Sequence, residues 1–163
     1  MKKILLTLFA GLTVCQVMAS PLASADCRHY QAFFYQLAEQ GYTDDSGQVA
    51  YDAQFDRAFT HLVAPLVSKD RRFRDKITSG PSTSGEVFAD GQGVYVRHEL
   101  CQAHQCADYK MITLYDVRSK RMVGLLLDHG KQRPLGSPSG DVLPLLTASQ
   151  ANSRLALCVS KAP

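Results

Sequence analysis

The chain has 163 residues, 45% of them hydrophobic, and carries 18 Lys and Arg against 15 Asp and Glu. Two of those 18 basic residues are Lys2 and Lys3, so the other 16 nearly balance the acids. Nucleic-acid-binding domains usually show a strongly basic face. This balance offers none, and we expect no nucleic-acid partner.

The N-terminus has the pattern of a secretory signal peptide. Two lysines precede an apolar run over residues 4–14, and small residues end at Ala19 and again at Ala25. The run is shorter than the roughly 20 residues that span a bilayer. We therefore predict a signal peptide over residues 1–25, with cleavage after Ala19 as the alternative. A lipoprotein with Cys15 as the lipidated residue is a weaker alternative.

Residues 26–163 are then expected to form a single periplasmic domain without membrane contact. Its first half has two apolar stripes at helical spacing. The first stripe ends before Gly41, and the second is expected to break at Pro65. The charged segment 69–76 is expected to be a solvated helix end or loop. The apolar residues of the two stripes are Tyr30, Phe33, Phe34, Leu37 and Ala38, then Phe55, Ala58, Phe59, Leu62 and Val63.

After a Ser- and Gly-rich connector at residues 79–85, the pattern changes to that of strands. A turn at 90–93 is expected to close the first hairpin. Residues 129–141 should form a long loop, 142–148 a short helix, and 154–160 a closing strand. Helices followed by strands predict an α+β fold: an antiparallel meander with helices on one side. The expected strands are 86–88, 94–100, 109–116 and 122–128.

Signal cleavage would leave four of the five cysteines, an even number that predicts disulfides in an exported protein. Three pairings are possible. Cys101 and Cys106 close the shortest ring, and Cys27–Cys158 would then tie the two ends of the domain together. The ring would join two strands and hold a single histidine, His104, near its middle.

A metal site is the alternative for the ring, because Cys101, His104 and Cys106 suit zinc chemically. No second ligand cluster accompanies them, so we favour the disulfide and expect no metal or cofactor. Within that interpretation, a stapled hairpin with an incidental histidine competes with a functional loop. His29, His61, His98 and His129 lack an evident partner, and surface or half-buried structural roles are expected for them.

Enzyme motifs are weak. Residues 136–140 resemble a nucleophile elbow only superficially, because Pro138 holds the serine position. No pair of acidic residues stands out as a glycosidase couple. We therefore expect a protein that is not an enzyme.

The hexapeptide Cys-Gln-Ala-His-Gln-Cys at 101–106, a following strand and Met-Val-Gly-Leu at 122–125 resemble the Ivy family, periplasmic inhibitors of vertebrate lysozyme. The likeness extends from about Phe55 to Leu125 and fades after Asp128. The family loop reads Cys-Lys-Pro-His-Asp-Cys. The resemblance implies a central antiparallel sheet with helices on one side and a protruding bridged loop.

The resemblance also implies that His104 enters the cleft of a C-type muramidase, with the disulfide as its clamp. Gln102, Ala103 and Gln105 replace the family's Lys, Pro and Asp, so a softer loop and an altered affinity or target are expected. The expected partner is lysozyme or a related muramidase, and a homodimer is an open alternative. The other functions considered are a periplasmic ligand-binding module, and a regulator or immunity protein for lytic transglycosylases or other peptidoglycan hydrolases.

Overall fold

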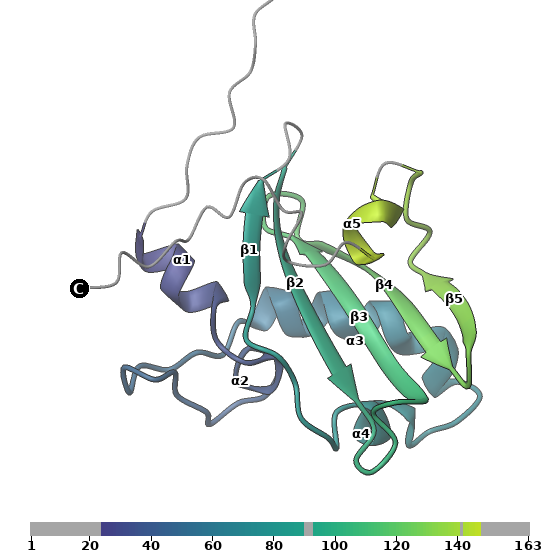
Figure 1. The fold of residues 1–163 in the computed structure, drawn as a ribbon. Coiled ribbons are helices and arrows are strands. Elements are labelled where there is room, and N and C mark those ends of the chain that lie inside the picture. Colours follow the sequence, from purple (N-terminus) through teal and green to yellow (C-terminus); the bar gives the residue numbers. More distant parts are fainter. Residues whose placement is uncertain (1–23, 90–92, 141, 148–163) are drawn as a thin grey trace, which may run out of the picture.

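The fold centres on a five-stranded antiparallel sheet in which spatial neighbours are also sequence neighbours (Figure 1). The computed structural model describes residues 24–89, 93–140 and 142–147. The strands are β1 (Glu86–Ala89), β2 (Val94–Cys101), β3 (Tyr109–Asp116), β4 (Arg121–Asp128) and β5 (Lys131–Leu135). The predicted α+β meander is confirmed.

Helices cover both faces of this sheet. α3 (Ala53–Val67) runs behind the sheet in Figure 1, while the short α5 (Leu143–Thr147) lies in front of it. The remaining helices are α1 (Ser24–Tyr30), α2 (Phe34–Ala38) and α4 (Phe73–Ile77). They contribute to the side that α3 covers, so the main helical layer lies on one face, as expected.

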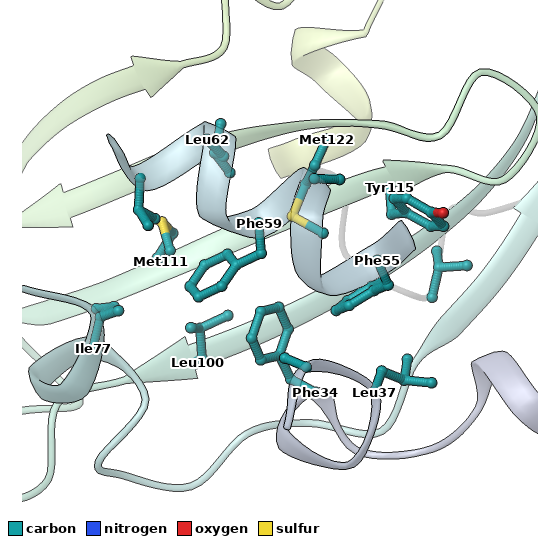
Figure 2. Close-up of a cluster of buried hydrophobic side chains, with 14 of the residues drawn as sticks. Phe34, Leu37, Phe55, Phe59, Leu62, Ile77, Leu100, Met111, Tyr115 and Met122 are labelled. Carbon is teal, nitrogen blue, oxygen red and sulfur yellow. The ribbon is translucent and has the colours of Figure 1, made fainter. Parts of the chain in front are cut away.

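The main core lies between α3 and the sheet, where strand alternation sends every second side chain toward the helix. Phe34 of α2 packs edge-to-face on Phe59 of α3, with ring centroids 4.7 Å apart. Such aromatic pairs add to the stability that burial provides. Figure 2 shows these rings between α3 and the strands, with Leu100, Met111 and Tyr115 closing the core from the sheet.

The opposite face is apolar at one end and charged at the other. Leu146 of α5 is fully buried in a cluster that includes Ile112 and Leu125. Farther along, Arg97 bonds to Glu86 at 3.1 Å, and Lys110 bonds to Glu99 at 2.9 Å. Buried apolar contacts therefore hold α5, and paired charges cover the rest of this face in the described residues.

The first apolar stripe forms two short helices instead of the single helix expected. The helical conformation is interrupted at Phe33, which is extended (φ −65°, ψ 152°) and forms an antiparallel β-bridge with Ser84. At this break the N–H of Gly85 donates to the carbonyls of Gln31 and Ala32. A continuous helix would use those carbonyls itself, so pairing with the connector overrides the helical pattern.

The predicted helix break at Pro65 is also wrong. Pro65 has no N–H to donate to the carbonyl four residues earlier, but α3 continues to Val67. The ladder resumes beyond the proline, where the N–H of Ser68 donates to Ala64 at 3.0 Å. Leu66 is buried in the core, and this packing holds the final turn together.

The charged segment forms more than a solvated end, because residues 73–77 are the helix α4. Phe73 and Ile77 are buried one helical turn apart. Arg74 pairs with Asp56 of α3 at 2.6 Å. Lys76 and Asp70 form an exposed pair on the other side, so only part of the segment is solvated.

The long loop expected over residues 129–141 contains the strand β5. Pro134 within the strand and the flanking Gly130 and Gly136 made the sequence resemble a loop. β5 is the last strand of the described sheet and pairs only with β4. An edge position tolerates proline, because one side of the strand donates no ladder hydrogen bonds. The expected helix after this segment is confirmed as α5.

Several predictions fall outside the described residues. These are the signal peptide up to residue 23, the tip of the first hairpin at 90–92, and the closing strand at 154–160. The predicted cleavage after Ala25 would remove the first two residues of α1. No helix in the described ranges is long and apolar enough to cross a membrane.

Candidate functional site: the bridged loop between β2 and β3

The cysteine ring joins β2 to β3 at one end of the sheet. Cys101 is the last residue of β2, and its disulfide to Cys106 brings their Cα atoms to 5.0 Å. Above the ring, the N–H of Gln102 donates to the carbonyl of Tyr109 and continues the ladder toward the loop. The ring therefore extends directly from two paired strands, as predicted, and its two sulfurs are bonded to each other.

His104 lies at the outer end of this ring and is exposed to solvent. A turn places it, because the N–H of Gln105 donates to the carbonyl of Gln102 at 3.0 Å. Its φ of 63° is in the left-handed region, which favours glycine or asparagine over other residues. Within the described residues no hydrogen bond or ion pair engages its imidazole, so both ring nitrogens are available to a partner.

The connector after α4 braces one side of the loop. The N–H of Gly80 donates to the carbonyl of Cys101 at 3.0 Å, and the N–H of Ala103 donates to Oγ of Ser79 at 3.0 Å. A Cβ at residue 80 would lie 2.6 Å from the Cys101 oxygen and 2.9 Å from the Ala103 nitrogen. Only glycine permits this close approach without a shift of the backbone.

The turn between β4 and β5 braces the other side. The N–H of His129 donates to the carbonyl of Asp108 at 2.7 Å, and the His129 ring lies 6.4 Å from that of Tyr109. Asp128 accepts a 2.7 Å hydrogen bond from Nδ1 of the same histidine. Sequence reasoning missed both braces. The available signals were Ser-Gly-Pro beside a helix end and a glycine between two strand-like segments.

The other histidines divide into different environments. His98 on β2 is fully buried, and its Nε2 is 3.0 Å from the Ala32 carbonyl. Burial outweighs that hydrogen bond and lowers the pKa of His98 to about 4. His29 pairs with Asp52 at 3.7 Å, whereas His61 is exposed on α3. The sequence had indicated no partner for His29, His98 or His129, and each has one.

A titratable cluster at the start of α3 has a structural role. Asp52 caps α3 by accepting from the N–H groups of Gln54 and Phe55, and it also accepts from the hydroxyl of Tyr30. Burial would raise the pKa of Asp52, but its pairing with His29 and these hydrogen bonds hold it well below the usual range. Burial and the nearby Asp52 charge raise the pKa of Tyr30. The cluster therefore fastens α1 to α3.

The remaining predicted site residues stay untested. Cys27 in α1 is buried and disulfide-bonded. Its predicted partner Cys158 lies outside the described residues, so the Cys27–Cys158 pairing stays a prediction.

Within the described ranges, no three His, Cys, Asp or Glu side chains gather as metal ligands. Residues 136–140 follow β5 as an irregular segment, with Ser137 at a φ of 54°.

The family model for Ivy, the inhibitor of vertebrate lysozyme, matches residues 64–152, which is more than half of the chain. The protein therefore belongs to the Ivy family of lysozyme inhibitors. The match continues past Asp128, where the sequence resemblance had faded, and so includes β5 and α5. No curated protein and no solved structure matches the chain.

Proposed function

We propose that the protein inhibits a C-type muramidase by inserting the loop 101–106, with His104 foremost, into the active-site cleft. The single observation that carries this proposal is the presentation of His104. Its imidazole is exposed and unpaired in the described part of the chain, on a ring that a disulfide and two neighbouring segments brace. Membership of a lysozyme-inhibitor family supports the choice of target.

The chemistry of such a cleft suits an imidazole. A retaining glycosidase holds two carboxyl groups roughly 5 Å apart on either side of its substrate. An imidazolium has N–H donors on opposite sides of its ring and can address both carboxyl groups at once. It also places positive charge where an oxocarbenium-like transition state would develop. His104 would thus occupy the cleft without supplying a bond that the enzyme can cleave.

Rigidity before binding supports the same mechanism. A loop that is already ordered loses less conformational entropy when it docks. Here the left-handed backbone of His104 costs free energy, as it does for residues other than glycine, and the surrounding contacts must offset that cost. The disulfide, the Ser79–Gly80 connector and the Asp108–His129 bond together supply that support.

The hydrogen bond from Ala103 bears on the loop's departure from the family pattern. The family's proline at this position has no N–H, so it cannot donate to a neighbour. Here the N–H of Ala103 donates to Ser79, and a tertiary hydrogen bond takes the place of the proline constraint. We infer that the loop retains its order despite Ala103, and that Gln102 and Gln105 adjust target choice.

The proposed site of action is the periplasm. The signal-like residues 1–25 and the disulfide-bonded cysteines are typical of an exported protein. The physiological target would then be a lysozyme that reaches the cell wall.

The experiment is a muramidase assay on cell walls with chicken-type lysozyme and residues 26–163 as the inhibitor. We expect stoichiometric inhibition. His104→Ala should weaken it by about tenfold or more, because truncating a central hot-spot residue typically costs 2 kcal/mol or above. His104→Asn should do the same while retaining a residue that tolerates positive φ.

His61→Ala is the matched control, since it removes an exposed histidine from α3. A folded His104→Asn variant that inhibits as strongly as wild type would overturn the plug mechanism. Clearing of walls by the protein alone would indicate a hydrolase, and absence of any effect would favour a ligand-binding module. Inhibition of a lytic transglycosylase but not of lysozyme would assign a bacterial target.

A further inference from the structure

The β4–β5 turn lies beside the bridged loop and presents a second histidine at the same end of the sheet. We propose that Asp128–His129 is a second recognition element, which contacts the rim of the cleft that the loop enters. This inference rests on the proposed function and extends it from one contact to two. Neither the sequence pattern nor the family likeness predicts a role for this turn.

The first support is the rigid connection between the turn and the loop. The 2.7 Å hydrogen bond from the N–H of His129 to the Asp108 carbonyl joins the two connections directly. β3 and β4 also pair over their whole length, from Tyr109 opposite Asp128 to Asp116 opposite Arg121. A partner that accepts the loop would therefore meet the turn in a set position.

The second support is backbone conformation. Four residues other than glycine have positive φ in the described chain, and two of them are His104 (φ 63°) and His129 (φ 48°). His129 precedes Gly130 (φ 78°) in a two-residue hairpin turn, where asparagine or aspartate is the usual choice. Backbone strain at residues other than glycine clusters at functional sites.

The third support is the chemistry of the pair. The side chains of His129 and Asp128 are 70% and 51% exposed. A carboxylate only accepts hydrogen bonds, so Nδ1 of His129 carries the hydrogen that it donates to Asp128. This arrangement orients the ring and leaves Nε2 for a polar group of the partner, such as a backbone N–H or an amide on the rim.

The size of a specific interface points the same way. A stable complex typically buries about 800 Å² and about 20–30 residues on each partner, many more than the six residues of the ring. The interface must therefore extend onto neighbouring segments. The β4–β5 turn is joined to the ring by a main-chain hydrogen bond and offers exposed hydrogen-bonding side chains.

The test measures lysozyme affinity by titration calorimetry on the disulfide-intact domain, with inhibition constants from the same preparations. His129→Asn removes the imidazole but keeps a residue suited to the turn. We expect roughly a three- to tenfold loss of affinity, which is smaller than for a central hot spot. Asp128→Asn should lose about half as much, because the ring remains but loses its orientation. His61→Asn is the matched control and should bind as wild type.

The outcomes separate the two proposals. A loss with His129→Asn at an unchanged melting temperature supports the second element, whatever His104 does. Affinity within twofold of wild type for both turn variants, while His104→Asn loses binding, would overturn the second element and leave the loop mechanism intact. Unchanged affinity in all three variants would overturn both proposals.

Discussion

His98 and His104 lie six positions apart on the same stretch of chain, yet their surroundings are opposite. His98 is fully buried on β2, and its Nε2 bonds to the Ala32 carbonyl. His104 lies just beyond the strand, exposed and in the left-handed region. The first histidine packs between the sheet and the helices, where it contacts the rings of Phe34 and Phe55.

This difference separates stability from recognition along one strand. At His98 the protein surrounds the ring with core residues and bonds it to its own backbone. At His104 the contacts within the described residues hold only the main chain. The imidazole is left free to bind a partner protein. Changes near the core should therefore alter stability and spare binding, whereas changes at the loop should do the opposite.

The largest expected effect on stability comes from replacing Cys27 of α1. Cys27→Ser should lower the free energy of unfolding by roughly 5 kcal/mol if Cys27 pairs with Cys158, because that bridge closes a long loop in the unfolded chain. Replacing both Cys101 and Cys106 with Ser should cost only about 2 kcal/mol in the same model. Urea unfolding measures both values.

Inhibition should follow the reverse order. Opening the short ring should weaken lysozyme inhibition, while Cys27→Ser should leave the inhibition constant unchanged below its lowered melting temperature. Normal inhibition by the variant that lacks both Cys101 and Cys106 would contradict this division between stability and recognition. The stability estimate for Cys27→Ser assumes the loop that a bridge to Cys158 closes. If non-reducing peptide mapping links Cys27 to another cysteine, that estimate must be recalculated for the new loop.

Acid should weaken the core through His98. Its pKa is lowered to about 4 in the folded protein, against an ordinary value of 6.5. The unfolded chain therefore binds the proton first as pH falls, and folding stability decreases between pH 6.5 and about 4. The total loss is about 3 kcal/mol, since each pH unit corresponds to about 1.4 kcal/mol.

Urea unfolding at intervals from pH 7 to 4 checks this expectation, with His98→Gln as the control. That variant starts less stable, because the site is tightly packed, but it should lack the slope in this window. His104→Asn should retain the full slope. Asp52 contributes separately: its lowered pKa stabilises the fold above pH 3.8, and that contribution is lost only as pH falls further.

A smaller expected effect sharpens the comparison at the loop. Gly80→Ala should weaken inhibition by roughly fivefold, because a shift of even 1 Å loosens a preorganised site. The added Cβ meets the backbone of Cys101 and Ala103, so the loop must move. Gly140→Ala is the matched control, since no atom within 4 Å would meet its Cβ. Enzyme titration with each variant measures the change.

The brace can be isolated further with Ser79→Ala. In the wild-type background this variant removes the acceptor for the Ala103 N–H and should weaken inhibition slightly. In an Ala103→Pro background no donor exists, so Ser79→Ala should have no additional effect. Equal losses in both backgrounds would show that Ser79 acts by some route other than this hydrogen bond.

Local patterns predicted much of the fold from the sequence. The expected strands at 94–100 and 109–116 match β2 and β3 closely, because each strand has one face on the α3 core. The helical stripe of α3 was found for the same reason. The errors at Phe33, Pro65 and Pro134 each reflect contacts outside the local pattern. Phe33 bridges Ser84, Pro65 lies in a helix whose last turn packs Leu66 into the core, and Pro134 pairs with β4 at the edge of the sheet.

The candidate site divides in the same way. The sequence by itself determined the ring of Cys101, His104 and Cys106 and its place between two strands, because the spacing of the cysteines and the strand periodicity are local properties. Only the tertiary structure decided that Ser79–Gly80 and His129 brace that ring. These contacts form between segments more than 20 residues apart along the chain, and no local pattern encodes such a meeting.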